Sequence, residues 1–141
     1  MIRKFQPDDR ERVMQLWLSG NLDAHSFVPR DYWISHAPMV RELLVQAELY
    51  VCELDGNIRG FAGVQDGSLA GIFVDQAHRS MGIGKRLLDY IKKRHPLFTL
   101  NVYQRNQRAV EFYLREGLSV IAEGIDEDTG EMDYTMQWSE T

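Results

Sequence analysis

Two glycines, Gly82 and Gly84, lie between an apolar run and a leucine-rich amphipathic stretch. Glycine lets the backbone adopt positive φ angles and approach a ligand closely. The free N–H groups of a helix's first turn, together with the helix dipole, attract anions. Arg79 and Lys85 add positive charge beside them. The pattern predicts a strand–loop–helix turn that binds a diphosphate, although it also fits glycines that only permit a tight turn.

The spacing of these glycines excludes two common nucleotide-binding loops. A Walker loop requires Gly-Lys followed by Ser or Thr, and a dinucleotide fingerprint requires two further glycine positions after a first strand. Neither pattern is present in the chain.

Hydrophobic periodicity predicts the elements that must position this turn. Strands are expected at 2–5, 49–54, 58–64, 69–74, 98–103, 118–123 and 132–138, and helices at 7–20, 40–47, 82–94 and 106–116. The segment 22–38 is expected to be irregular. Hairpin turns are expected at Asp55-Gly56 and at 65–67. The order β-α-α-β-β-β-α-β-α-β-β predicts an α/β fold, a mixed α+β sheet covered by helices, in which the crossover helix 82–94 joins two parallel strands.

Length and composition narrow the class of protein further. The 141 residues are 44% hydrophobic and 26% charged, which predicts a single globular domain, 1–141. The net charge of −5 disfavours a nucleic-acid partner. A lone cysteine, Cys52, excludes an internal disulfide, and the histidines lack the spacing of a metal site. With no apolar run of about 18 residues and no signal-peptide pattern, we expect no membrane association and a cytoplasmic monomer or homodimer.

Two motifs in the second half of the chain resemble those of the GNAT family of N-acetyltransferases. Residues 79–84, Arg-Ser-Met-Gly-Ile-Gly, are similar to the signature Arg/Gln-x-x-Gly-x-Gly/Ala. Residues 106–118 are similar to Asn-x-x-Ala-x-x-Phe-Tyr-x-x-x-Gly-Phe, and the order of elements also matches. The departures are Ser80, where a glycine is common, and Leu118, where phenylalanine is usual.

The resemblance implies a small bacterial-type N-acetyltransferase that uses acetyl-CoA and no metal. Acetyl-CoA would lie in a V-shaped gap between the strands 69–74 and 98–103. Its pantetheine arm would pair with one strand and its diphosphate would take N–H groups from the turn. The residues implied in these two contacts are Ile72, Phe73, Val74, Arg79, Ser80, Met81, Gly82, Ile83, Gly84 and Lys85. Lys85, Arg86, Arg105 and Arg108 are candidates for the 3′-phosphate end, or they are solvated helix charges.

Two asparagines are implied on the cofactor side as well. Asn106 suits a helix N-cap, because its side chain can accept from free N–H groups, and the family also uses it to bind the CoA arm. Asn101 would hold the thioester or an ordered water, or it would bond only to its strand neighbours. Because an amide is no base at neutral pH, Asn101 does not replace the glutamate that many relatives carry there.

Tyr113 occupies the position at which the family places its general acid. A phenol, with an ordinary pKa of about 10, is protonated at neutral pH and so has a proton to give to the departing thiolate. The general base stays open. His25 has a suitable ordinary pKa and lies in a segment that lines the acceptor pocket in this family. Glu53 and a chain of water molecules are the other candidates.

The acceptor is the least determined part of the reaction. Phe27, Tyr32 and Trp33 would wall the acceptor site or fill the core beneath it. The run 123–133 holds six carboxylates and no Lys or Arg, which suits either a cationic acceptor or a solvated hairpin tip. We expect a primary amine, on a protein lysine or a small molecule, and the acyl group need not be acetyl alone. The alternative hypotheses are a non-catalytic acyl-CoA-binding sensor or adaptor and a tRNA-directed acetylating toxin.

Overall fold

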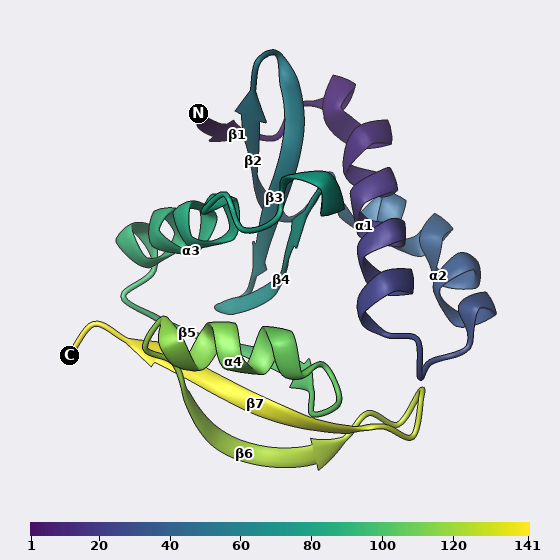
Figure 1. Ribbon diagram of the computed structural model, residues 1–141, viewed down its shortest axis with the longest axis vertical. Helices are drawn as coiled ribbons and strands as arrows, with labels where there is room; N and C mark the ends of the chain where they lie inside the picture. Colours follow the sequence, from purple (N-terminus) through teal and green to yellow (C-terminus); the bar gives the residue numbers. More distant parts are fainter.

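A computed structural model describes residues 1–141 as one twisted seven-stranded sheet with helices on both faces (Figure 1). The strand order is β1-β2-β3-β4-β5-β7-β6. The strands are β1 Ile2–Lys4, β2 Glu48–Leu54, β3 Asn57–Gln65, β4 Ser68–Val74, β5 Leu97–Tyr103, β6 Ser119–Ile125 and β7 Met132–Ser139. The helices are α1 Arg10–Ala24, α2 Arg30–Leu43, α3 Ile83–Arg94 and α4 Gln107–Arg115, with short 3-10 turns η1 Pro7–Asp9 and η2 Gln76–His78. The predicted mixed α/β fold is confirmed.

Two buried clusters hold the helices against opposite faces of the sheet. Val51 packs with Val13 and Leu16 of α1. Its neighbour Cys52 packs with Leu87 and other apolar residues of α3. Because successive strand residues point to opposite faces, α1 and α3 sandwich the sheet between them. None of the helices is long and apolar enough to cross a membrane.

The hairpin turns form where the Asp-Gly pairs predict them. Asp55 and Gly56 connect β2 to β3, and Asp66 and Gly67 connect β3 to β4. All four residues have positive φ angles, between 53° and 79°. Two successive left-handed residues match the right-handed twist of the flanking strands, which is why Asp-Gly is favoured there.

The expectation of an irregular segment at 22–38 is wrong. Helix α1 continues through Gly20 to Ala24, and α2 begins at Arg30 and contains Pro38. Gly20 serves close packing rather than helix termination, because a Cβ there would lie 2.8 Å from Cδ1 of Phe73. The buried Trp33 of α2 packs edge-on against Trp17 of α1. Tertiary packing of this kind outweighs the local preference of Gly and Pro.

The predicted parallel pair, β4 and β5, touches at one end and then separates. Their register contains a single pair, Ser68 with Thr99. Beyond it, β4 is paired only with β3, and β5 only with β7. The side of β4 that faces β5 therefore leaves backbone N–H and C=O groups without a strand partner, and a gap opens in the middle of the sheet.

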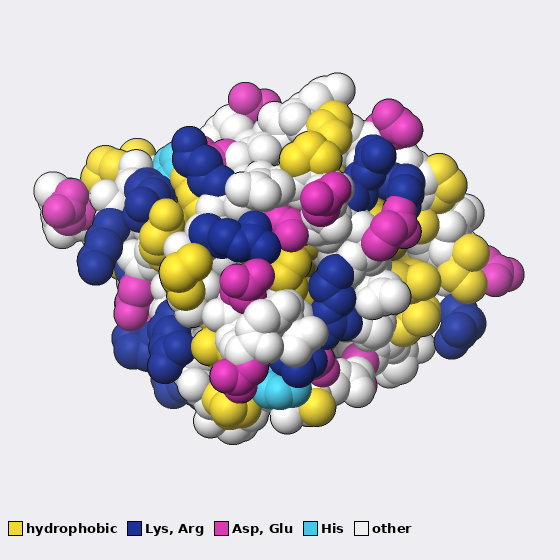
Figure 2. Space-filling model, turned by 90° about the horizontal axis from the view of Figure 1, so that it is seen from above, with side chains coloured by type: hydrophobic (Ala, Val, Ile, Leu, Met, Phe, Trp, Pro, Cys, Tyr) yellow, Lys and Arg dark blue, Asp and Glu magenta, His cyan; other side chains and the backbone are white.

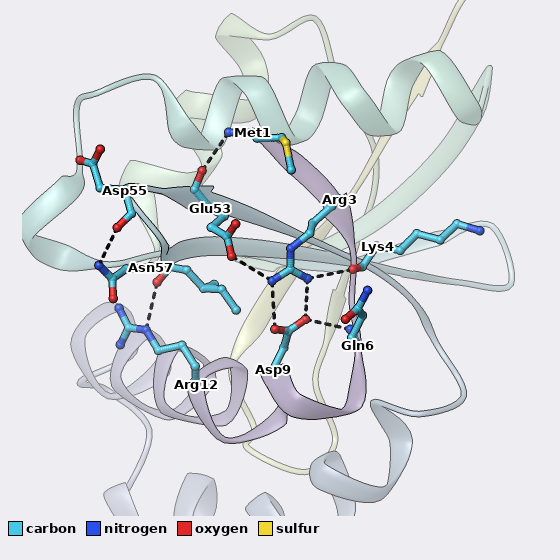
Figure 3. Close-up of polar contacts among 10 residues, drawn as sticks. Met1, Arg3, Lys4, Gln6, Asp9, Arg12, Glu53, Asp55 and Asn57 are labelled. Atoms are coloured by element: carbon cyan, nitrogen blue, oxygen red, sulfur yellow. Dashed lines mark hydrogen bonds and ion pairs between the residues drawn. The ribbon is translucent and has the colours of Figure 1, made fainter.

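An ion-pair network fastens the first strand to the rest of the fold (Figure 3). The Arg3 guanidinium donates to both carboxylate oxygens of Asp9, at 2.8 and 3.1 Å, and to Glu53 at 3.1 Å. Asp9 is buried, and its hydrogen bonds from Arg3 hold its pKa below the usual range. Arg3 therefore joins β1, η1 and β2 and neutralises a largely buried carboxylate.

We expect Arg3→Met to lower the free energy of unfolding by about 2–4 kcal/mol, because it leaves the buried Asp9 carboxylate without its partner. Urea unfolding at pH 7 measures this difference. The exposed neighbour Lys4 supplies the control, since Lys4→Met should change stability by less than about 0.5 kcal/mol. Equal effects of the two substitutions would contradict the proposed role of Arg3.

Candidate active site

The gap between β4 and β5 opens into a cleft of about 1050 Å³, walled by residues of α1, β4, α3, β5 and α4. Most of the residues predicted from the sequence meet there: His25, Ile72, Phe73, Val74, Arg79, Ser80, Gly82, Ile83, Gly84, Lys85, Asn101, Asn106 and Tyr113. Met81 does not line the cleft, and 55% of its surface is exposed. Only the backbone of Met81 could therefore contact a ligand at this turn.

The loop between η2 and α3 presents a row of free amides. The backbone N–H groups of residues 80–85 donate no hydrogen bond within the protein. Ser80 and Gly82 adopt left-handed φ angles of 66° and 82°. A left-handed Ser80 also explains why glycine is common at this position, because glycine adopts this conformation without strain. Such a row of N–H groups at a helix N-terminus fits a diphosphate.

Ion pairs to α1 and β3 hold the residue that precedes this loop, Asp75. The Asp75 carboxylate accepts from Arg12 of α1 at 2.8 Å and from Arg59 of β3 at 3.3 Å. It also accepts from the N–H of Ala77, and these contacts contribute to a lowered pKa at Asp75. These contacts fix the beginning of the loop against α1 and β3. Little rearrangement of its amides is then needed to bind an anion.

The positive charges predicted beside the turn are largely neutralised. Arg79 forms an ion pair with Asp23 at 2.8 Å, and Lys85 with Glu116 at 3.0 Å. Arg105 pairs with Glu131 at 3.6 Å. Anion binding at the turn therefore depends chiefly on the backbone amides rather than on these side chains.

Two arginines of α4 line the cleft without a carboxylate partner. They are Arg108 and Arg115, whereas Arg86 does not line the cleft. Sequence reasoning missed Arg115. The signal was available, because residues seven apart lie on one face of a helix.

Tyr113 lies on α4 with 7% of its surface exposed and lines the cleft. Burial raises the pKa of its phenol well above the ordinary value. The hydroxyl therefore keeps its proton at physiological pH and has one to donate, but the raised pKa also makes it a weaker acid.

The two asparagines have different surroundings. Asn106 is the N-cap of α4, as predicted, and its Oδ1 accepts from the N–H of Ala109 at 3.4 Å. Asn101 accepts from Thr135 Oγ1 at 2.9 Å across the β5–β7 pair. Both side chains line the cleft.

His25 lies at the end of α1 among aromatic rings. Trp33 stacks on its imidazole with ring centroids 5.3 Å apart, and Tyr103 and Phe27 meet it edge-on. Burial lowers the pKa of His25 to about 4, so the ring is neutral at pH 7. Its Nδ1 lies 3.0 Å from Asn21 Oδ1, and its Nε2 lies 3.1 Å from Asn106 Nδ2.

The aromatic residues expected near the acceptor divide into two groups. Trp33 lines the cleft, whereas Phe27 and Tyr32 do not. Phe27 packs behind His25 and Tyr103, and Tyr32 donates to Asp128 at 3.4 Å. Glu53, the other side chain considered as a base, lies outside the cleft, where it pairs with Arg3.

Two carboxylates of the β6–β7 hairpin line the cleft, and both belong to the acidic run 123–133 that the sequence offers for a cationic acceptor. Asp126 accepts from the Tyr103 hydroxyl at 2.6 Å. The Asp133 carboxylate forms no ion pair within the protein, although it lies opposite Tyr103 in the β5–β7 register. Strand register places it there, and no local pattern predicts that register. No group of three or more His, Cys, Asp or Glu side chains is arranged to hold a metal ion.

A sheet split beside a row of free amides, with a buried phenol in the gap, is the architecture of an N-acetyltransferase. Residues 46–117 match the model of the acetyltransferase (GNAT) domain. The chain is 35% identical over 140 residues to peptidyl-lysine N-acetyltransferase YiaC of Escherichia coli, covering 98% of this chain and 96% of YiaC. The chain therefore belongs to the GNAT family, which confirms the predicted class of enzyme.

Solved structures agree with this assignment at the level of the fold. The apo form of YjaB from Escherichia coli superposes with a TM-score of 0.87 at 23% identity, covering all of this chain and 98% of YjaB. The PaiA N-acetyltransferase from Thermoplasma acidophilum, solved in complex with coenzyme A, superposes with a TM-score of 0.80 at 19% identity, covering 99% and 98% of the two chains.

The lowered pKa of His25 predicts a pH dependence of folding. The unfolded chain binds a proton on this histidine near pH 6.5, whereas the folded protein does so only near pH 4. The stability that the neutral ring contributes is thus complete above pH 6.5 and is lost as the pH falls toward 4. Four carboxylates with lowered pKa values contribute to the pH dependence of stability at lower pH: Asp9, Glu11, Glu48 and Asp75.

Denaturant unfolding between pH 7 and 5 measures this loss. In His25→Gln, which cannot titrate, we expect a flatter dependence of unfolding free energy on pH over that interval. Identical slopes for the two proteins would show that His25 does not carry the effect.

Proposed function

We propose that this chain transfers an acetyl group from acetyl-CoA directly to a primary amine, with the lysine side chain of a protein or peptide as the preferred acceptor. The observation that carries the proposal is the row of unbonded amides at residues 80–85 beside the separated strands. The name of the relative YiaC, a peptidyl-lysine N-acetyltransferase, supports this acceptor class. We further propose that residues 1–141 act as one transferase domain in the cytoplasm.

Acetyl-CoA would bind as an added half-strand at the split in the sheet. The unpaired backbone of residues 72–74 suits the amides of the pantetheine arm, and the free N–H groups of residues 80–85 suit the diphosphate. Arg108 and Arg115 are the cations without carboxylate partners on that side, so they suit the 3′-phosphate. This arrangement would leave the thioester near the middle of the cleft.

The reaction forms a C–N bond and breaks a C–S bond, and the lysine ammonium first loses one proton to water. The neutral amine attacks the thioester carbonyl, and the C–N bond forms as the C–S bond breaks. Tyr113 protonates the departing thiolate and later recovers a proton from solvent, while water carries away the proton that the nitrogen loses. Holding amine and thioester together supplies much of the rate by proximity.

The acceptor would enter from the side of the cleft that carries carboxylates and aromatic rings. Asp133 has no ion-pair partner there, and Tyr103 and Trp33 add aromatic lining to the same cleft. An alkylammonium group is complementary to this combination. We propose that Asp133 binds the lysine ammonium before its deprotonation.

The competing hypotheses predict other partners. On the face shown in Figure 2, basic side chains gather at the left and acidic ones are interspersed across the rest, without a continuous basic stripe. A tRNA-directed enzyme would use such a stripe to bind the phosphate backbone. The net charge of −5 also argues against that role.

A thiol-release assay against a panel of amines tests the proposal. The panel includes lysine peptides, a polyamine, an aminoglycoside and aminoacyl-tRNA. We expect the lysine peptide to give the highest kcat/KM.

Asp133→Asn should raise the KM for the peptide roughly tenfold or more, because it removes a charged hydrogen-bond partner. Asp55→Asn, at the β2–β3 turn, is the matched control and should leave KM unchanged. Tight CoA binding without transfer to any amine would instead support a sensor.

Removal of the Tyr113 hydroxyl tests the general acid. Tyr113→Phe should slow turnover at least tenfold and preserve acetyl-CoA binding measured by calorimetry, since the ring still packs on α4. Tyr90→Phe is the control and should retain full activity. Tyr90 is also on a helix, α3, and its ring lies under the guanidinium of Arg94 in the same helix. Unchanged turnover in Tyr113→Phe would remove Tyr113 from this role.

A further inference from the structure

We infer that His25 is a positioning residue: a directional hydrogen-bond chain through its ring fixes Asn106 for the CoA arm, and the ring does not act as the general base. The inference rests on the proposed function, because it assigns Asn106 a contact with acetyl-CoA. The chain runs from the C-terminal end of α1 to the N-terminus of α4, between side chains 81 positions apart.

The α1 end of the chain determines which ring nitrogen carries the proton. Asn21 Nδ2 donates to the backbone oxygen of Trp17 at 2.9 Å, so its Oδ1 faces His25. That oxygen lies 3.0 Å from His25 Nδ1 and can only accept. Nδ1 must therefore carry the hydrogen.

The contact at the α4 end independently requires the same tautomer of His25. Asn106 Oδ1 accepts from the N–H of Ala109 at 3.4 Å, so its Nδ2 faces His25. Nδ2 can only donate, and it lies 3.1 Å from His25 Nε2, which must supply a lone pair. Two separate amides thus select one neutral tautomer, with hydrogen on Nδ1 and the lone pair on Nε2.

This arrangement leaves the imidazole no free nitrogen to take a proton from a substrate. The rings of Trp33, Phe27 and Tyr103 enclose it, and the Tyr103 hydroxyl is already donated to Asp126. Arg105 lies over the ring of Phe27, 5.5 Å from its centroid. No carboxylate faces the imidazole to stabilise an imidazolium, and a proton on Nε2 would oppose the N–H of Asn106.

The chain has a consequence for the donor side of the cleft. An asparagine amide has two N–H groups. One is directed to His25, which fixes the plane of the Asn106 side chain and leaves the other for a carbonyl oxygen of the CoA arm. His25 would therefore affect acetyl-CoA binding, even though it lies on the acceptor wall.

Three substitutions at His25 separate positioning from base catalysis. A glutamine can place Oε1 where Nε2 lies and accept from Asn106. An asparagine is shorter and can retain only the bond to Asn21, and leucine retains neither. We expect KM for acetyl-CoA to rise about three- to tenfold in His25→Asn and His25→Leu, the effect of one lost hydrogen bond. His25→Gln should stay within twofold of the wild type, with kcat little changed in all three.

The readouts are steady-state kinetics with the lysine peptide, the Kd of acetyl-CoA by calorimetry, and thermal unfolding to confirm that each variant folds at the assay temperature. A general base would instead give equal, large losses of kcat in all three variants, since no amide is a base. That result, or an acetyl-CoA Kd equal to the wild-type value in His25→Asn and His25→Leu, would overturn the inference. Failure of the wild type to bind acetyl-CoA would count against the proposed function itself.

Discussion

The structure depends on one constraint, the separation of β4 from β5 after the single pair of Ser68 with Thr99. A continuous parallel pair would use its backbone groups internally and close the sheet. Here each strand is completed on its other side only, β4 by β3 and β5 by β7. The half-sheets stay joined at one end, and the opposite ends diverge around α3 and α4. The cleft therefore results from the pairing of the strands, and the side chains only line it.

The two walls of the cleft use different chemistry. The α3 side offers backbone N–H groups, while Arg79 and Lys85 are already paired with Asp23 and Glu116. Recognition through amides needs no excess of basic residues, which is consistent with a net charge of −5. The opposite wall presents Asp126, Asp133 and aromatic rings. An anionic donor and a cationic acceptor can thus enter one cleft without competing for the same groups.

Prediction from the sequence succeeded where the signal is local. The Asp-Gly turns, the Asn106 cap and the amphipathic helix after Gly82 all depend on neighbouring residues. It failed at residues 22–38, because Gly20 and Pro38 suggest breaks that the packing of Phe73 and Trp33 overrides. The same limit applies to Asp133, which enters the cleft through the β5–β7 register, and to His25, whose second partner, Asn106, lies 81 positions further along the chain.

The sequence by itself determined the fold class, the glycine-containing turn before α3 and the family, because these depend on periodicity, glycine positions and motif spacing in consecutive residues. Only the tertiary structure decided which charges remain available. It pairs Arg79 and Lys85 with carboxylates, leaves Arg115 without a carboxylate partner and Asp133 without a basic one, and places Glu53 outside the cleft. It also set the protonation of His25, through burial, the amide of Asn21 in α1 and the amide of Asn106, 81 positions away. Charge state and hydrogen-bond direction depend on neighbours in space, and the order of residues along the chain does not specify those neighbours.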